Sequence, residues 1–529
     1  MTAHTRHSPG PAPGQAAHVP RRWLALAVLC VSLLIVNLDN TVLNVALPTL
    51  VRDLGATSSQ LQWIVDSYAL VFAGLLLTAG SLADRVGRKR TFLAGLAAFA
   101  IGSAWAAFSG SVAVLTAARA SMGIGAALLM PSTLSIITDM FRDTRERQRA
   151  IGFWAGTSGV GFALGPIIGG LLLAHFWWGS VFLINIPIAV AGLLCALPLV
   201  PDSSNPAALA PDFAGALLSI AGLAMILWSI IEAPVHGWTS ALVIGTGLGG
   251  LAVLAVFAVW ERASSHPMLN LRFFRARSFS GAIASLSLVM FALIGSLFLL
   301  TQLLQFVFGY SALQAGVRVL PMAAAIVVVA PLSSVAVRLA GTRLTVAAGL
   351  LMIAAGFWQI SQATVTWTYT SILPGMVVIG VGAALAIPSA TGSVMGSLPR
   401  GDTGVGSATN GVSIQVGGAL GVAVIGSLLS TRYQGRMAAA LAPYHLPHDI
   451  ANVILGSVGG ALSVAARVGG ATGSLLAHLA RASFISGMDL GLVTGAAVAA
   501  AAAVLALAVL PARRAQAADG STAAERMNE

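Results

Sequence analysis

The sequence predicts an all-α membrane protein, from its composition, its repeated apolar segments and the placement of its basic residues. Hydrophobic residues make up 57% of the 529 positions and charged residues only 9%, whereas a soluble domain carries about 25% charged residues. So few charges cannot cover the water-facing surface of a soluble protein of this length. We therefore expect the bilayer to be the main solvent of the chain.

Fourteen apolar segments are long enough to cross a bilayer, whose hydrocarbon core of about 30 Å requires about 20 residues of helix. Residues 1–20 read as a disordered tail, and 512–529 as a second tail. The Ala/Gly-rich stretch 432–482 reads as a long outer loop that could carry a surface helix. The predicted spans are 23–47, 60–80, 91–110, 112–134, 149–174, 180–201, 213–233, 241–261, 279–302, 313–338, 343–362, 369–395, 405–431 and 483–510.

Basic residues gather in alternate connections between these spans. With fourteen spans, all of these connections fall on one side of the membrane, together with both termini. Cytoplasmic loops carry an excess of Arg and Lys, so we expect both termini to be cytoplasmic. The net charge of +11 then reflects membrane topology and not nucleic-acid binding. The basic residues are Arg21, Arg22, Arg85, Arg88, Lys89, Arg90, Arg142, Arg145, Arg147, Arg262, Arg272, Arg275, Arg277, Arg338, Arg343, Arg400, Arg513 and Arg514.

An internal repeat supports the count of spans. The run Gly161-Phe-Ala-Leu-Gly165 returns 256 residues later as Gly417-Gly-Ala-Leu-Gly421. The same offset carries the start of the first span to the start of the ninth. We expect six-helix bundles at 21–201 and 279–511, with two linking helices and a cytoplasmic loop at 202–278. Parallel halves of this kind are typical of transporters.

Three motifs occur in a fixed order along the first half. They are Leu38-Asp-Asn-Thr-Val-Leu-Asn-Val-Ala-Leu-Pro48, Gly80-Ser-Leu-Ala-Asp-Arg-Val-Gly-Arg-Lys-Arg90, and Gly156-Thr-Ser-Gly-Val-Gly-Phe-Ala-Leu-Gly-Pro-Ile-Ile-Gly-Gly170. Over about residues 22–511 the chain resembles the major facilitator superfamily, and in particular its 14-helix drug/proton antiporters. The resemblance implies two bundles in pseudo-twofold relation. It also implies proton-coupled export of small amphipathic, cationic or antibiotic compounds across a bacterial cytoplasmic membrane by alternating access.

The second motif reads as a tight cytoplasmic turn. Gly80 and Gly87 permit sharp changes of backbone direction, and Asp84 can form charge-assisted hydrogen bonds with basic neighbours. The resemblance implies a gating latch that closes the inner face, whereas a plain topology signal would need only the positive charge. The basic members of this loop are Arg85, Arg88, Lys89 and Arg90.

The third motif places a glycine at every fourth position of the fifth span. Gly161, Gly165 and Gly169 form a flat face that permits close approach of another helix, and Pro166 can bend the helix there. Ordinary helix packing would use the same face. A role in setting export direction is implied only by the resemblance.

Ionisable residues within spans are costly and are functional candidates by default. Asp39, Asp66 and Arg119 lie roughly 10–12 Å from the outer ends of their helices, at 1.5 Å per residue. We expect Asp39 to interact with Arg119, directly or through substrate, while Asp39 or Asp66 exchanges protons. A structural salt bridge is the alternative for Asp39 and Arg119, and exposure to an outer vestibule is the alternative for Asp66.

Weaker candidates lie near helix ends. Glu232 and Asp489 read as interfacial, Tyr68 as part of an outer aromatic belt or a substrate contact, and Gln302 as lining the path. No phosphate-binding loop of the form G-x-x-x-x-G-K-[ST] occurs, nor any metal-ligand spacing.

We therefore expect no enzyme and no cofactor other than a proton gradient. The expected partners are a small-molecule substrate, protons and the lipid bilayer, with the chain as a monomer. Two alternatives stay open: a dedicated exporter of one metabolite, lipid or self-made antibiotic, and a membrane sensor that transports nothing.

Overall fold

The computed structural model describes residues 19–204, 210–264, 267–269, 271–398 and 403–510. Over these ranges the chain forms helices and no strand, and 14 helical segments are long and apolar enough to cross a membrane. These segments match the predicted spans in number and order, which confirms the fold class. The tails predicted at the two termini lie almost wholly outside the described residues.

The first half is built from six membrane-length helical segments. Helix starts are set by side-chain caps: Thr57 and Gln60 form a reciprocal capping box before α2, and Asp143 accepts the amides that begin α5. The elements are α1 (Val19–Leu54), α2 (Ser58–Val86), α3 (Arg88–Ala107), α4 (Val112–Met140), α5 (Thr144–His175), α6 (Ser180–Leu183) and α7 (Asn185–Leu199).

The rest of the chain contains the inserted pair and the second half. Two of its spans carry tighter or wider turns: η1 precedes α11 and η2 extends it, and η3 separates α12 from α13. The elements are α8 (Phe213–Ile231), α9 (Ala233–His236), α10 (Ala241–Ala263), η1 (Leu271–Arg275), α11 (Arg277–Gln302), η2 (Leu303–Val307), α12 (Ala312–Val329), η3 (Ala330–Leu332), α13 (Ser333–Ala340), α14 (Thr342–Ser361), α15 (Tyr369–Gly396), α16 (Thr403–Leu441), α17 (His448–Gly456), α18 (Val458–Val468) and α19 (Gly470–Val509).

The two halves repeat the same packing. Helix α1 packs on α5 as α11 packs on α16, and α3 packs on α4 and α7 as α14 packs on α15 and α19. Between the halves, α2 contacts α16 and α5 contacts α12. These two contacts are equivalent, because in each of them the second span of one half meets the fifth span of the other. The sequence repeat therefore corresponds to a pseudo-twofold arrangement of two bundles.

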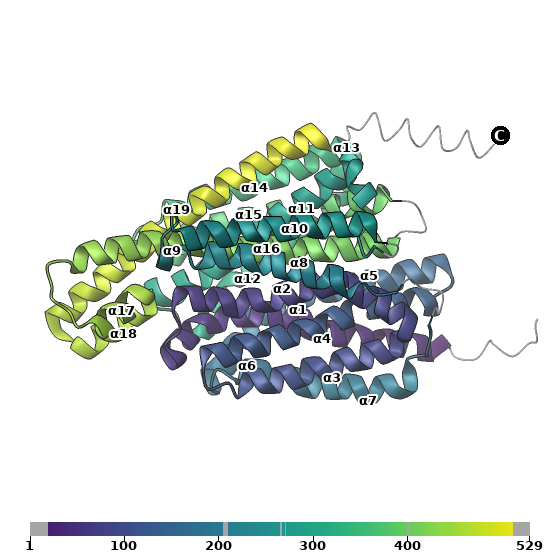
Figure 1. Ribbon diagram of the computed structural model, residues 1–529, viewed down its shortest axis with the longest axis horizontal. Coiled ribbons are helices and arrows are strands. Elements are labelled where there is room, and N and C mark those ends of the chain that lie inside the picture. The colour runs from purple at the N-terminus through teal and green to yellow at the C-terminus, as the bar shows by residue number, and fades with distance from the viewer. Residues whose placement is uncertain (1–18, 205–209, 265–266, 270, 399–402, 511–529) are drawn as a thin grey trace, which may run out of the picture.

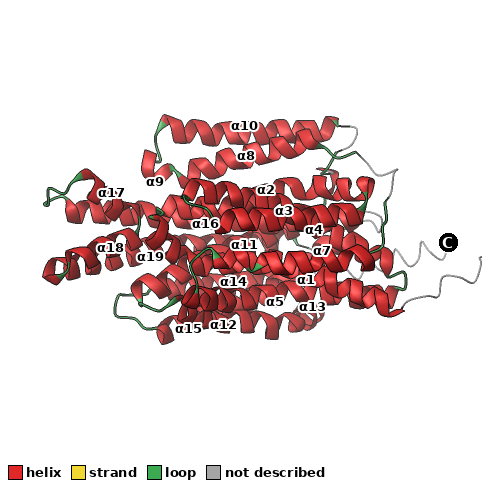
Figure 2. Cartoon of the chain, turned by 90° about the horizontal axis from the view of Figure 1, so that it is seen from below, coloured by secondary structure: helices red, strands yellow, loops and turns green. Residues whose placement is uncertain are grey.

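The inserted helices lie outside this pair of bundles. Helix α8 packs on α2 and α16, and α10 packs mainly on α8. Figure 2 shows α10 at the edge of the molecule, with α8 between it and α2. The face of α10 that turns away from α8 is consequently left for lipid.

The two ends of the bundle are called the arginine-rich end and the opposite end. The arginine-rich end holds the α2–α3 and α4–α5 connections, the N-terminal end of α1 and the C-terminal end of α19. The opposite end holds α17 and α18, which project beyond the bundle (Figure 1). The segment 432–482, predicted as a long outer loop, is instead mostly helical, because α16 continues to Leu441 and α19 begins at Gly470.

Helix α18 covers the opposite end at the junction of the two halves. A Cβ on Gly459 would come within 2.6 Å of Val51 in α1 and 2.7 Å of Phe306 in η2. Next to this contact the side chain of Gln305 donates to the carbonyl of Val45, 2.9 Å away. The opposite end is therefore closed by side-chain and backbone contacts between the halves.

The predicted glycine face of α5 is confirmed as a close helix contact. A Cβ on Gly161 would lie 2.7 Å from Asn37, and one on Gly169 would lie 3.1 Å from Val42, both in α1. Gly165 faces Thr41 between them. In the second half, Gly421 of α16 lies against the backbone of Phe291 in α11. The repeated glycines thus bring equivalent helices together in both halves.

This packing predicts that Gly421→Ala lowers stability. The new methyl group would overlap the backbone of Phe291, with its Cα 2.8 Å away, and overpacking of this kind costs about 1–3 kcal/mol. Gly435→Ala is the matched control, because Gly435 lies in the same helix with nothing within 4 Å of its Cβ position. Thermal unfolding of the detergent-solubilised protein measures both. An equal melting temperature for the two variants would contradict the close contact.

Candidate functional site

A buried ion pair joins α1 and α4 inside the first half. Arg119 donates through Nη1 to Oδ2 of Asp39. The two side chains are 1% and 2% exposed, so neither charge reaches solvent on its own. The predicted interaction of Asp39 with Arg119 is therefore direct.

Neighbouring groups complete the hydrogen bonding of this pair. Asn185, at the start of α7, donates to the other carboxylate oxygen of Asp39 at 3.2 Å and to Oγ of Ser103 in α3 at 3.3 Å. Arg119 also donates through Nε to the carbonyl of Ile64 in α2 at 3.2 Å. Its guanidinium carbon lies 4.3 Å from the ring centre of Tyr68. One polar cluster thus connects α1, α2, α3, α4 and α7.

The cluster stabilises its members only as a set. Removing a charge from water costs several kcal/mol, and that cost is offset only where the partner and the remaining hydrogen bonds are in place. The cation–π contact with Tyr68 adds a favourable interaction that is strongest when desolvated. Asp39 and Arg119 are therefore held in one geometry as long as both carry their charges.

Asp66 is buried at the same level of α2 but lies outside this cluster. Its side chain is fully buried, and neither carboxylate oxygen has a hydrogen-bond partner in the part of the chain that the structure describes. Along α2 it lies between Ile64 and Tyr68, both of which contact Arg119. The two acids thus share a layer, as predicted, while their surroundings differ.

Helical periodicity places Asp66 on the face of α2 that packs against α16. One turn earlier, Gln62 accepts a hydrogen bond from Ser427 of α16 at 3.2 Å. One turn later, Leu70 packs with Ala419 and Ala423 of α16. Residues four apart lie on one face of a helix. Asp66 therefore belongs to the interface between the halves, and exposure to a vestibule at the opposite end is excluded in this state.

The second motif, residues 80–90, forms a turn with one glycine and not two. Gly87 separates α2 from α3 with φ +125°, a backbone conformation that other residues rarely adopt. Gly80 lies inside α2, where a Cβ would make only an ordinary contact with Pro131 at 3.7 Å. The prediction of a turn at Gly80 is therefore wrong, because the helix continues through it to Val86.

The charged side chains of this motif bind partners in the first half and in the connection that follows it. Arg88 donates to Asp84 at 2.8 Å and lies 3.6 Å from Asp139 of α4. Lys89 donates to the carbonyl of Leu197 at 2.7 Å. Over the described residues, the ion pairs of the arginine-rich end lie within the first half or reach the connection that follows it. Arg85 is exposed, and Arg90 lies 3.9 Å from Asp202.

The third motif, residues 156–170 in α5, reaches the other half through its proline. Helix α5 runs unbroken from Thr144 to His175 through Pro166. The carbonyl of Pro166 lies against Gly316 of α12. The motif therefore contacts α1 through Gly161, Gly165 and Gly169, and the second half at Pro166 and Gly170.

The structure changes the assignment of the weaker candidates. Glu232 accepts a hydrogen bond from the indole of Trp63 at 3.0 Å and ties α8 to α2. Tyr68 is fully buried, so it belongs to the ion-pair cluster and not to an aromatic belt. Gln302 donates to the carbonyl of Phe298 in its own helix. Asp489 lies well inside α19, because that helix begins at Gly470 and not near residue 483.

Asn185 and Ser103 were not anticipated from the sequence. Asn185 is a polar residue within an apolar span, which is a signal that could have been used. Ser103 carries no such signal, because serine within a membrane helix commonly bonds its own backbone. Its contact with Asn185 depends on how α3 and α7 pack.

Comparison with known proteins places the chain in a family. The sequence pattern of the Major Facilitator Superfamily matches residues 29–422. Multidrug efflux pump LfrA of Mycolicibacterium smegmatis is 37% identical over 493 residues, 92% of this chain and 96% of that protein. The tetracenomycin C resistance and export protein of Streptomyces glaucescens is 34% identical, over 94% of each chain. Methyl viologen resistance protein SmvA of Salmonella typhimurium is 35% identical, over 78% of this chain and 83% of that protein.

Solved structures agree on the fold. A bacterial homologue of the human lysosomal transporter Spinster, in an inward-facing and unoccupied conformation, superposes with a TM-score of 0.65 at 18% identity, over 94% of this chain and 100% of that one. At this identity the likeness concerns the fold alone. The match over most of the chain and the full-length relatives show that the chain belongs to the major facilitator superfamily.

Proposed function

We propose that the protein is a proton-coupled efflux transporter that exports small amphipathic, mainly cationic compounds by alternating access. The observation that carries the proposal is the pair of buried acids in one layer, one paired with arginine and one without a partner at the interface of the halves. The relatives named as multidrug, tetracenomycin C and methyl viologen resistance proteins support export as the direction and drugs as the cargo.

Asp66 is the group that we assign to proton exchange. A buried carboxylate without a partner is costly, whereas a neutral carboxylic acid is far less so. In the state with a tight α2–α16 contact, Asp66 is therefore best accommodated with its proton. Separation of α2 from α16 would let water or a cationic substrate reach the carboxyl and favour loss of the proton.

In this proposal the ion pair of Asp39 and Arg119 holds in position the helix that carries Asp66. Their ion pair holds α2 through Ile64 and Tyr68, which flank Asp66 along the helix. The pair thereby positions the proton-exchanging residue. Direct contact with substrate is not needed for this role.

The arginine-rich end is assigned to the cytoplasm by the excess of basic residues in its connections. Both termini are then cytoplasmic, in the inner membrane of a bacterium. The sealed opposite end, where α18 contacts α1 and η2, supports a state that faces the cytoplasm. We further propose that a monomer works with the proton gradient alone and needs no cofactor.

Asp66→Asn tests the assignment of proton exchange. The amide keeps the size of the neutral acid and cannot ionise. In proteoliposomes containing this variant, transport of methyl viologen driven by a pH gradient should fall to the rate of protein-free vesicles. Exchange of labelled for unlabelled substrate without a gradient should continue. Asp53→Asn is the control, because Asp53 is an exposed acid at the end of α1, and it should transport like the wild type.

Two results would contradict the proposal. Gradient-driven transport by Asp66→Asn at the wild-type rate would exclude Asp66 from coupling. Equal cellular accumulation of a broad panel of cationic compounds, with and without the protein, would exclude multidrug efflux. Export of a single compound from that panel would favour a dedicated exporter instead.

Asp39→Asn is expected to act on stability as well as transport. The substitution leaves the buried guanidinium of Arg119 without its counter-charge, and breaking a buried pair costs about 3–5 kcal/mol. Asp66→Asn breaks no ion pair and should melt close to the wild type. Thermal unfolding in detergent compares the two variants, and similar melting temperatures for both would contradict the different roles assigned to the two acids.

A further inference from the structure

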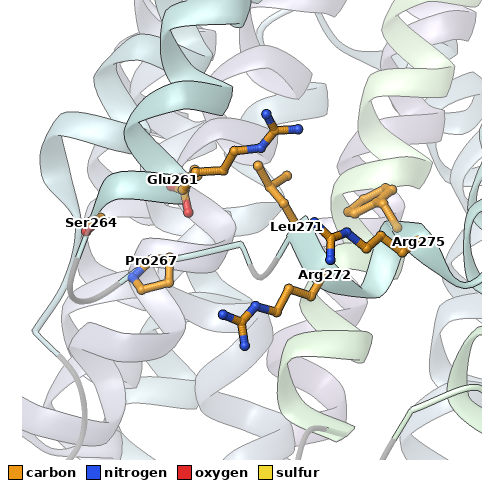
Figure 3. A pocket seen from close by; sticks show the side chains of 8 residues that line it. Glu261, Ser264, Pro267, Leu271, Arg272 and Arg275 are labelled. Carbon is orange, nitrogen blue, oxygen red and sulfur yellow. The ribbon is translucent and has the colours of Figure 1, made fainter.

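A cavity of about 660 Å³ lies at the arginine-rich end, where α10 leads through η1 into the second half. Its volume is within the roughly 300–1,000 Å³ typical of ligand sites. Figure 3 shows Arg272 and Arg275 extending from η1 on one side of it, with Glu261 and Pro267 on the other. Arg262, at the end of α10, completes a lining that holds three arginines.

Two of these arginines are available to a ligand. Arg262 and Arg275 are exposed, and neither has a hydrogen-bond or ion-pair partner over the described part of the chain. A guanidinium presents several N–H donors in a planar fork that matches the oxygens of a phosphate. The pocket therefore offers donors for a phosphate group at two independent positions.

The one acid of the lining is occupied elsewhere. Glu261 is 4% exposed, and its Oε2 accepts from the backbone amide of Leu269 at 2.9 Å. Its Oε1 and Oδ2 of Asp212 would both lie 2.7 Å from a Cβ on Gly215, so the two carboxyl groups approach each other behind the pocket. Asp212 also accepts from the indole of Trp260 at 2.9 Å. Glu261 thus stabilises the pocket wall through its hydrogen bond with Leu269. The positive charges of Arg262 and Arg275 have no counter-charge among the described residues.

An apolar surface adjoins the pocket on the lipid side. Helix α10 packs mainly on α8, and its side chains Val256 and Val259 are 55% and 62% exposed close to Arg262. Trp260 and Phe274 are also exposed, at 43% and 36%. A soluble anion would use only the arginines, whereas a phospholipid would also cover this apolar surface. Basic pockets at the cytoplasmic ends of membrane helices suit acidic headgroups.

We propose that this pocket binds the phosphate group of an anionic phospholipid, with Arg262, Arg272 and Arg275 around the headgroup and the acyl chains along the exposed face of α10. The site lies outside both bundles and contains none of the residues assigned to transport. It joins the inserted helices to the second half at the level of the lipid headgroups.

The test compares lipid retention by arginine variants of the full chain. The protein is purified in detergent, mixed with phosphatidylglycerol or phosphatidylcholine, and examined by native mass spectrometry. The wild type should retain phosphatidylglycerol in preference to phosphatidylcholine. In Arg262→Gln/Arg275→Gln, retention of phosphatidylglycerol should fall about tenfold or more, because each arginine supplies charge-assisted hydrogen bonds. Neither substitution removes a hydrogen bond or an ion pair between described residues, so folding should be unaffected.

Arg142→Gln/Arg149→Gln is the matched control. Both residues are exposed, lie in the α4–α5 region of the same end and have no described partner. This variant should retain phosphatidylglycerol like the wild type. Equal loss in both double variants would overturn the site in favour of a general attraction to positive charge. Equal retention of the two lipids by the wild type would overturn it outright.

A soluble headgroup separates the two sources of phosphate. Glycerophosphoglycerol has the same phosphodiester without acyl chains, and it should not displace the lipid at matched concentration. Displacement would assign the pocket to a soluble anion and contradict the lipid proposal. Because binding is measured without a gradient, its failure would leave the proposed export standing, and the reverse also holds.

Discussion

The buried ion pair between Asp39 and Arg119 is the constraint on which the first half depends. Two charges in the interior are tolerated only when each is satisfied, so the surrounding helices must supply the missing hydrogen bonds. Asn185 does so for the carboxylate and the carbonyl of Ile64 does so for the guanidinium. One polar cluster therefore connects five helices, and separating α1 from α4 would leave both charges without their partners in the apolar interior.

Much of the fold could be predicted because it follows from composition and period. Span lengths follow from the bilayer thickness, and the four-residue spacing of Gly161, Gly165 and Gly169 indicates a close helix contact before its partner is known. The continuation of α16 and α19 beyond the membrane could not be predicted in this way, because Ala- and Gly-rich sequence suits a helix or a loop. Gly80 shows the same limit, since a glycine can lie within a helix as well as at a turn.

The ionisable residues of the site were predicted, but their arrangement was predicted only in part. Depth along a helix can be counted from the sequence, so Asp39, Asp66 and Arg119 were placed in one layer. The direction of a side chain around its helix depends on which neighbours that helix has. Asp66 lies on the helix face of Gln62 and Leu70, which contact α16, whereas the ring of Tyr68 and the backbone carbonyl of Ile64 contact Arg119. Counting residues along a helix does not give this direction. It is the direction that leaves Asp66 without a partner while Asp39 is paired with Arg119.

The two halves share an architecture but not a chemistry. Among the described residues from Arg277 onward, no charged side chain is buried, whereas the first half buries Asp39, Asp66 and Arg119. The second half instead presents small residues such as Ala419 and Ala423 to α2. A rocking motion of one half against the other leaves the Asp39–Arg119 pair intact, because both members lie in the same half. The same motion changes the surroundings of Asp66, because the wall opposite it belongs to α16. The asymmetry therefore supports the proposal that Asp66 exchanges protons, because Asp66 lies at the boundary that such a motion would change.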